Sequence, residues 1–251
     1  MIKVRSFVFN CLLFGYSSAY IILLLWMFMP FDRKYMQAAV GWWSLSLIWL
    51  LRHVVHLDFQ VRGRENLPDG PCILACKHQS AWETMIFYDL TPDPAYVIKK
   101  ELMDSWFYGW YAVKAEMVRV DRDGGGAALK AMVRDVQRAV DKGRKVIIFP
   151  EGTRTAPGKA GTYFPGVAAL YNRVDVPMVP VALNSGMFWA RRGFVKLPGM
   201  ITMEFLPAIP RGLKRAEFLE KLESGVEDAT RRLEREAVER YPMAASALSG
   251  Q

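Results

Sequence analysis

A long uncharged run at the amino end constrains this chain more than any other feature of its sequence. None of the 26 residues from Ser6 to Phe31 carries a charge. As a helix the run would measure about 39 Å, at ~1.5 Å per residue, and a hydrocarbon core is ~30 Å thick. Pro30 and the charged stretch DRK that follows predict a break after it. The run therefore predicts a membrane-associated helix.

A second uncharged run, from Tyr35 to Leu51, predicts a helix that pairs with the first. Its 17 residues lie at the short limit for spanning a bilayer, and Arg52 closes it. Tryptophan rings favour membrane interfaces. Four of the eight tryptophans fall in these two runs: Trp26, Trp42, Trp43 and Trp49. Residues 1–56 are therefore expected to form a membrane-anchoring helical hairpin.

The hairpin interpretation leaves two arrangements open. Both helices cross the bilayer, or the hairpin dips into one leaflet and returns. In either arrangement the rest of the chain emerges on the side of the amino terminus, and Lys3 and Arg5 predict that this side is the cytoplasm. A cleaved signal peptide fits less well, because the apolar stretch is too long and no clear cleavage site follows it.

Beyond residue 56 the pattern changes to that of a layered α/β domain. Short β-branched and apolar runs alternate with amphipathic stretches. Strands are expected at 58–63, 72–76, 95–99, 117–120, 145–149, 178–183 and 201–206. Helices are expected at 81–90, 102–113, 125–142, 165–173 and 214–240. We therefore expect residues 57–251 to form a single domain with a mixed, mostly parallel sheet flanked by helices.

The stretch 214–240 has the periodicity of a long amphipathic helix. Apolar side chains recur at roughly helical spacing among many charges. These residues are Phe218, Leu222, Val226, Leu233 and Ala237. The domain is therefore expected to carry a carboxy-terminal amphipathic helix.

The net charge of +8 suits partners that carry phosphate, such as nucleic acid, anionic lipid or phosphorylated cofactors. A bilayer anchor makes anionic lipid the simpler partner, so nucleic acid is not expected. The three cysteines, Cys11, Cys72 and Cys76, give no disulfide framework. A reducing compartment is therefore expected for the folded part.

Two glycine-containing stretches invite comparison with phosphate-binding loops. In DGGGAALK, 123–130, Asp123 fits a helix N-cap and the glycines permit a turn between strand and helix. In EGTRTAPGK, 151–159, five residues separate the two glycines and Ala160 follows the lysine. A nucleotide-binding P-loop has four residues there and a Ser or Thr after the lysine. The first stretch is thus interpreted as a helix start, and the second is not a P-loop.

The stretch HQSAWE, 78–83, pairs a histidine with an acid. His78 follows a predicted strand, and Glu83 falls in the first turn of a helix that Ser80 can cap. A carboxylate bound to one ring nitrogen fixes the tautomer and leaves the other nitrogen free to accept a proton. A capping serine and a structural histidine explain the same letters, so the residues alone leave both interpretations open.

Two further strand ends carry polar groups. The stretch FPEGTR, 149–154, follows one strand and ends in Arg154, and VDR follows another and ends in Arg122. The guanidinium fork of arginine matches phosphate. Taken singly, each arginine is equally a surface charge. Three strand ends with polar groups are typical of a crevice at one edge of a sheet.

Together these stretches resemble the bacterial 1-acyl-sn-glycerol-3-phosphate acyltransferases of the glycerolipid acyltransferase family. The motifs occur in the order and at the spacings usual for that family: HQSAWE (78–83), KKEL (99–102), VDR (120–122), FPEGTR (149–154) and VPMVPVAL (176–183). The resemblance covers about residues 57–190, and the amino-terminal apolar segment also matches the family. It implies a protein of the inner (cytoplasmic) membrane whose catalytic domain faces the cytoplasm.

The resemblance also implies a reaction and its residues. An acyl chain would pass from acyl-CoA or acyl carrier protein to the free hydroxyl of 1-acyl-glycerol 3-phosphate, giving phosphatidic acid, without a cofactor or a metal. His78 would be the general base, Glu83 would orient it, and backbone N–H groups near them would stabilise the oxyanion. Six residues would bind substrate: Lys100, Arg122, Glu151, Gly152, Thr153 and Arg154. The lysine and the two arginines among them would hold the acceptor phosphate. The expected partners are the lysophospholipid acceptor, the acyl donor and membrane lipids.

The chain departs from the family pattern at three positions. Glu83 stands where aspartate is usual, and Glu116 stands where glycine is common. Phe164 replaces a lysine that often follows the third motif, which removes a possible phosphate contact. The acceptor could therefore also be another lysolipid or glycerol 3-phosphate.

Two interpretations from other classes remain. A membrane-tethered lipid-binding protein would share the hairpin and the charge but would release no thiol from acyl-CoA. A zinc enzyme would draw on His53, His56 and His78, but the HVVH stretch adjoins the hairpin and lacks partner ligands.

Overall fold

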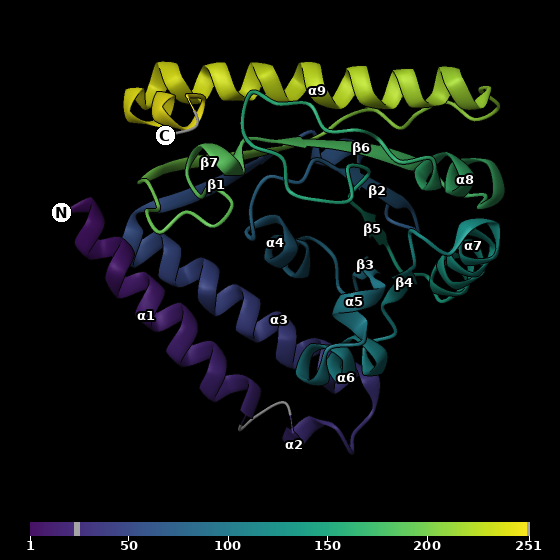
Figure 1. The fold of residues 1–251 in the computed structure, drawn as a ribbon, viewed down its shortest axis with the longest axis horizontal. Coiled ribbons are helices and arrows are strands. Elements are labelled where there is room, and N and C mark those ends of the chain that lie inside the picture. Colours follow the sequence, from purple (N-terminus) through teal and green to yellow (C-terminus); the bar gives the residue numbers. More distant parts are fainter. Residues whose placement is uncertain (23–25, 250–251) are drawn as a thin grey trace.

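A seven-stranded sheet lies at the centre of the structure, a computed structural model that describes residues 1–22 and 26–249 (Figure 1). The strands are β1 (Leu57–Arg62), β2 (Ile73–Cys76), β3 (Ala95–Lys99), β4 (Val118–Val120), β5 (Val146–Ile148), β6 (Met178–Leu183) and β7 (Gly199–Phe205). Their order is β1-β7-β6-β2-β5-β3-β4. The five strands from β6 to β4 run parallel, β7 is antiparallel to β6, and β1 is parallel to β7. The mixed, mostly parallel sheet predicted from the sequence is confirmed.

Helices cover both faces of the sheet. They are α4 (Glu83–Leu90), α5 (Lys100–Met103), α6 (Trp106–Lys114), α7 (Gly125–Asp141), α8 (Gly166–Arg173) and α9 (Arg215–Arg240). In Figure 1 α9 lies along one side of the sheet and α3 and α4 lie on the other. Alternation along β2 explains the layering, because Ile73 and Ala75 pack with α7, α8 and α9 while Leu74 and Cys76 pack with α3 and α4. A strand buried on both faces reads as a continuous apolar run, as β2 does.

The helix predicted at 102–113 is in fact two helices. α5 ends at Met103, and α6 begins at Trp106 after an extended Ser105. The two pack so closely that a Cβ on Gly109 would overlap the carbonyl of Met103. The break falls at Asp104 and Ser105, two polar residues between apolar stretches, which the prediction of one continuous helix passed over.

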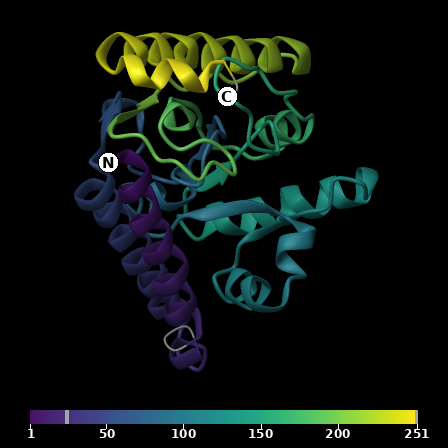
Figure 2. The ribbon, with the colours of Figure 1, turned by 60° about the vertical axis from the view of Figure 1, so that its left-hand side comes forward.

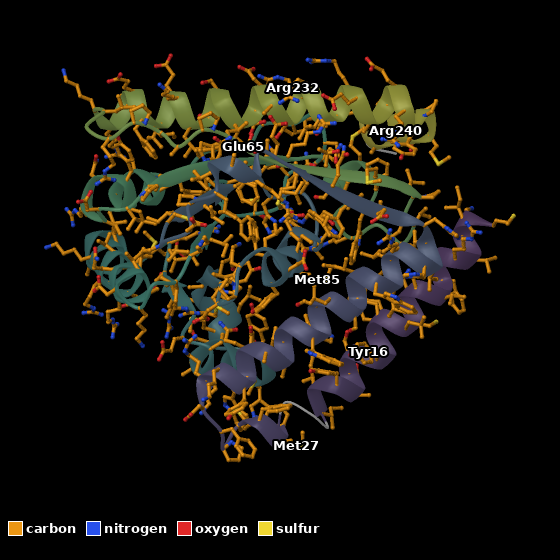
Figure 3. All side chains as sticks on the ribbon, turned by 180° about the vertical axis from the view of Figure 1, so that it is seen from behind. Tyr16, Met27, Glu65, Met85, Arg232 and Arg240 are labelled. Carbon is orange, nitrogen blue, oxygen red and sulfur yellow. The ribbon has the colours of Figure 1, made fainter. Side chains whose placement is uncertain are left out.

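The carboxy-terminal amphipathic helix is confirmed as α9. Its five predicted apolar residues are all buried against the sheet and its neighbours. Charged residues such as Arg232 and Arg240 lie along its other faces (Figure 3). The helix is 26 residues long and follows every strand of the sheet in the chain.

The amino-terminal residues form a pair of antiparallel helices (Figures 1 and 2). The bounds are α1 (Ile2–Tyr20), α2 (Trp26–Phe28) and α3 (Arg33–Leu50), which continues as a π-helical turn, Leu51–Val55. The hydroxyl of Tyr20 donates to the carbonyl of Ala39 at 2.7 Å and ties the pair together. The hairpin shares one hydrophobic core with the sheet, since Phe9, Met36 and Leu47 pack in the same cluster as Leu74.

The two apolar runs do not map simply onto two spanning helices. The predicted helix over 6–31 crosses residues outside the described part of the chain, and α1 itself begins earlier, at Ile2. Within residues 1–22 and 26–249, one helical stretch is long and apolar enough to cross a membrane, Arg33–Val55. It is longer than the predicted run 35–51 because the π turn extends it.

The amino end of α1 is fixed to the domain by a buried lysine. Lys196, on the loop before β7, is 4% exposed and donates to the side-chain oxygen of Asn10 and to the carbonyls of Gly193 and Phe194. Within the described residues no carboxylate lies within ion-pair distance of it. Burial lowers the pKa of Lys196 to about 8.

This burial predicts a pH dependence of stability. The unfolded chain, in which the lysine pKa is about 10.4, binds more protons than the folded chain between about pH 8 and pH 10. The free energy of unfolding should therefore rise with pH in that window, by at most ~1.4 kcal/mol per pH unit from this group. In Lys196→Met this part of the slope should vanish, as measured by denaturant titration in detergent. Identical slopes in the parent and the variant would contradict the prediction.

Candidate active site

The parallel strands bring polar residues to one edge of the sheet. Every strand from β6 to β4 points its carboxyl end the same way. The residues at or beyond these ends are His78, Lys99, Arg122, the 149–154 loop and Ser185. A cavity of about 1000 Å³ opens there, lined by His78 and the cations among others. The predicted crevice at the strand ends is thus present.

His78 and Glu83 point toward each other across the start of α4. The Nδ1 atom of His78 lies 2.8 Å from Oε1 of Glu83. The imidazole stacks on the ring of Phe149, with 4.0 Å between centroids, and the histidine lines the cavity. A carboxylate accepts and does not donate, so Nδ1 carries the proton and the lone pair of Nε2 remains free. The geometry is that of an oriented base.

Three other donors hold the Glu83 carboxylate in place. Its Oε1 also accepts the backbone N–H groups of Gln79, at 2.7 Å, and Ser80, at 2.6 Å. Its Oε2 accepts the hydroxyl of Ser185 at 2.8 Å. The side chain is fully buried, and hydrogen bonds of this kind compensate the cost of burying the charge.

Ser185 is a site residue that sequence reasoning missed. It follows β6 in a 3₁₀ turn, 102 residues from Glu83, and is itself fully buried. The stretch NSG after a predicted strand looks like an ordinary turn, so its letters gave no signal. The expectation that every parallel strand end contributes to the crevice would have marked it as a candidate.

The loop before α4 differs from prediction in two respects. The helix begins at Glu83 rather than at Ala81, and the hydroxyl of Ser80 accepts the N–H of Trp82 at 3.3 Å ahead of it. The N–H of His78 donates to Glu151, and those of Gln79 and Ser80 donate to Glu83. These three N–H groups are therefore already engaged, and an oxyanion would need other backbone donors near the motif.

Glu151 lies beneath the catalytic loop rather than on the cavity wall. Its side chain is fully buried, and Oε1 accepts the N–H of His78 at 3.0 Å. Its Oε2 pairs with Nζ of Lys77 at 2.9 Å and accepts the hydroxyl of Thr155 at 2.6 Å. This placement assigns Glu151 to support of the loop, whereas the resemblance implied that it binds substrate.

The other predicted binding residues divide between the cavity and its rim. Gly152, Thr153 and Arg154 line the cavity. Lys100 pairs with Asp121 at 3.0 Å, and its neighbour Lys99, which was not predicted, is the lysine on the cavity wall. Lys99 is the last residue of β3 and Lys100 is the first of α5, and the sequence did not locate this boundary to one residue.

Arg122 and Arg154 are positively charged side chains without a carboxylate partner among the described residues. Arg122 lies over the face of Phe164, 5.1 Å from its centroid, and donates to the carbonyl of Gly152. Within the described residues neither arginine has a carboxylate within ion-pair distance. Burial is the largest influence on the pKa of each and lowers it. A bound phosphate would relieve this unpaired charge.

The inner part of the cavity is apolar and aromatic. α3 contributes Val40 and Trp43 to its lining, and Tyr88, Tyr111 and Met117 also line it. The hydroxyls of Tyr88 and Tyr111 bond to each other, and burial raises the pKa of both phenols. These groups therefore stay neutral, and the space suits a hydrocarbon chain.

The cysteines and the other histidines take no part in this site. Burial raises the pKa of Cys72 to about 11 and raises that of Cys76 well above its usual value, so both are protonated thiols. Over residues 1–22 and 26–249 no three His, Cys, Asp or Glu side chains gather as a metal cluster. The zinc interpretation, which needed His53 and His56 beside His78, therefore finds no ligand set.

Comparison with known proteins agrees with this geometry. A family model described as Acyltransferase matches residues 58–184, which include His78, Glu83 and all six predicted binding residues. The chain belongs to the acyltransferase family. The 1-acyl-sn-glycerol-3-phosphate acyltransferase of Pseudomonas aeruginosa is 34% identical over 206 residues, covering 80% of this chain and 79% of the relative. The human beta enzyme of the same name is 29% identical over 185 residues, covering 72% and 65%.

A solved structure shares the fold. The 1-acyl-sn-glycerophosphate acyltransferase PlsC from Thermotoga maritima superposes with a TM-score of 0.73 over 93% of this chain and 98% of that chain. At 21% identity the likeness concerns the fold alone.

Gly152 offers a test of the arginine site. Its φ is +64°, and a Cβ there would overlap the guanidinium of Arg122. Gly152→Ala should displace Arg122 and weaken binding of glycerol 3-phosphate by about tenfold, because a lost charged hydrogen bond costs about 1.5–3 kcal/mol. Calorimetry measures this affinity. Gly143→Ala is the matched control, since Gly143 has φ +76° but open space around it. Equal losses in both variants would attribute the effect to backbone strain.

Proposed function

We propose that this protein transfers a fatty acyl chain from an acyl thioester to the free hydroxyl of 1-acyl-glycerol 3-phosphate, giving phosphatidic acid. The observation that carries the proposal is the His78–Glu83 pair, whose free ring nitrogen belongs to a cavity with an arginine rim and an apolar interior. The relatives named above carry this activity in their names, which supports the choice of acceptor.

The chemistry follows from the free lone pair of His78. Nε2 takes the proton of the acceptor hydroxyl while the hydroxyl oxygen attacks the carbonyl carbon of the thioester. The new C–O bond forms, the C–S bond breaks, and the thiolate leaves with the proton that the imidazolium returns. Glu83 stabilises that imidazolium, and a positioned base of this kind contributes roughly 10²–10⁴-fold in rate. The step forms no bond between the acyl group and the protein.

Substrate binding follows from the two halves of the cavity. Arg122 and Arg154 would hold the acceptor phosphate, with Lys99 and Thr153 beside them. The aromatic interior would hold the hydrocarbon chain. Acyl-CoA and acyl carrier protein both present a suitable thioester. Phe164 stacks on Arg122, where a lysine would repel it, so the departure from the family pattern keeps the arginine in place.

We place the protein at the cytoplasmic face of the inner membrane, anchored by the hairpin. Large apolar side chains of the hairpin are exposed, including Phe7, Phe14, Trp42 (78%) and Trp49 (58%). α6 adds a stripe at i, i+4 and i+7, with Trp106, Trp110 and Val113 all exposed. Figure 1 places α6 near the lower end of α3, with which it is in contact. Apolar patches this extensive on a folded protein mark an interaction surface, and tryptophan favours the bilayer interface.

The reaction is tested with purified protein, labelled acyl-CoA and 1-acyl-glycerol 3-phosphate, with other lysolipids and glycerol 3-phosphate as competing acceptors. His78→Ala should lower kcat by about 10²–10⁴-fold, because the base is lost. Glu83→Gln should cost less, since the amide oxygen still accepts one hydrogen bond. Full activity in His78→Ala would refute the base. Lipid retention without thiol release by the parent would favour the binding-protein alternative.

The membrane surface is tested by flotation with vesicles of phosphatidylethanolamine and phosphatidylglycerol. The double variant Trp42→Ser with Trp49→Ser should bind at least about tenfold more weakly, because burying one large apolar side chain is worth about 1.5–3 kcal/mol. Leu248→Ser is the control: Leu248 is 42% exposed but directly follows the 3₁₀ turn Pro242–Ala247, which packs on α9. Equal binding by the double variant and the parent would rule out this face of α3 as the contact.

A further inference from the structure

A buried network of charges lies on the side of the catalytic loop that faces away from the cavity. Lys77 continues the alternation of β2, so it points to the α9 face while His78 points to the cavity. The lysine is fully buried. Its Nζ atom lies 2.9 Å from Oε2 of Glu151 and 2.7 Å from Oε1 of Glu227, which belongs to α9.

This network connects α9 to the backbone of the base. Glu227 holds Lys77, Lys77 holds Glu151, and Glu151 accepts the N–H of His78 at 3.0 Å. The hydroxyl of Tyr163 also donates to Glu227, at 3.1 Å. Each link is short and buried, so a change at Glu227 is transmitted to His78 through two ion pairs and one hydrogen bond.

A second carboxylate of α9 holds the next residue of the loop. Glu234 follows Glu227 by seven residues, or two helical turns, and so lies on the same face of α9. It accepts the side-chain amide of Gln79 at 2.8 Å and the N–H of Gly158 at 3.1 Å. The other end of the Gln79 amide accepts the N–H of Gly186, directly after Ser185.

Packing alone does not explain these two carboxylates. Both are at most 5% exposed, whereas the neighbouring Asp228 and Arg235 are exposed. Burial is the largest influence on the pKa of Glu234 and raises it, because burying the charged carboxylate is unfavourable. An apolar side chain of similar volume generally stabilises a fold as well as a buried ion pair does or better. The carboxylates instead meet both neighbours of His78 in the sequence.

We propose that Glu227 and Glu234 are positioning residues for the general base: α9 fixes the loop 77–80 from behind so that His78 meets Glu83 and the acceptor hydroxyl. The inference rests on the proposed acyl transfer and names two residues, far along the chain from the catalytic motif, on which its rate depends. Neither residue lines the cavity, so neither contacts substrate.

The test compares Glu227→Gln and Glu234→Gln with a matched variant on the same helix. Both should lower kcat by about tenfold or more, because small displacements of a reacting group are costly, while KM for donor and acceptor changes little. Glu236→Gln is the control, since Glu236 pairs with Arg62 at 2.7 Å and with Arg232 at 3.3 Å on the outer side of α9.

Hydrogen exchange followed by mass spectrometry gives a readout that does not require activity. The N–H groups of His78, Gln79 and Ser80 are bonded to buried carboxylates and should exchange slowly in the parent. Their exchange should be at least about tenfold faster in the two test variants, and its rate should be unchanged in Glu236→Gln. Should Glu227→Gln not fold, Glu234→Gln suffices, because it keeps the Lys77 ion pairs.

The outcomes separate this inference from the proposed function. An inactive parent would refute the acyl transfer, whatever the exchange rates. An active parent whose kcat is unchanged in both test variants would overturn the positioning role alone. A fall in kcat without faster exchange at 77–80 would overturn it too, as would an equal fall in Glu236→Gln.

Discussion

The Glu83 carboxylate is the interaction on which the site depends. A charge in a fully buried position is stable only when donors surround it, and here those donors come from the loop at 78–80 and from Ser185. Two are backbone N–H groups that fix the loop, one is the hydroxyl of Ser185 after β6, and one is the imidazole itself. The same four bonds therefore compensate the buried charge, set the loop conformation and choose the tautomer of His78.

The parallel sheet supplies the conditions for that arrangement. Its parallel strands end at one edge, so loops from distant parts of the chain meet there and their side chains come into contact. The α4 side of the edge carries the base and the cavity, and the α9 side carries buried ion pairs. Residues that are adjacent in sequence, such as Lys77 and His78, thereby serve opposite faces of the same sheet.

Much of this could be predicted from the sequence, and the reasons are local. Strand positions followed from β-branched runs, and the acid five residues after His78 marked the pair because a helix start turns Glu83 back toward the loop. The break between α5 and α6 is marked only by the pair Asp104 and Ser105, and the close approach of Gly109 to Met103 depends on how the two helices pack. Ser185 and Glu227 could not be chosen either, since each contacts its partner across more than a hundred residues of chain. Periodicity predicted the apolar face of α9, but it gives no sign of which acids on that helix turn inward.

The position of α9 in the chain has a consequence for synthesis in the cell. The hairpin, which we place in the membrane, and all seven strands precede α9 in the chain, so they leave the ribosome before it does. Until α9 emerges, Lys77 lacks Glu227, one of its two carboxylate partners, and the side of the loop 77–80 that α9 later covers is exposed. A nascent chain would thus reach the bilayer before its histidine is locked in place, and membrane insertion would come before catalytic competence.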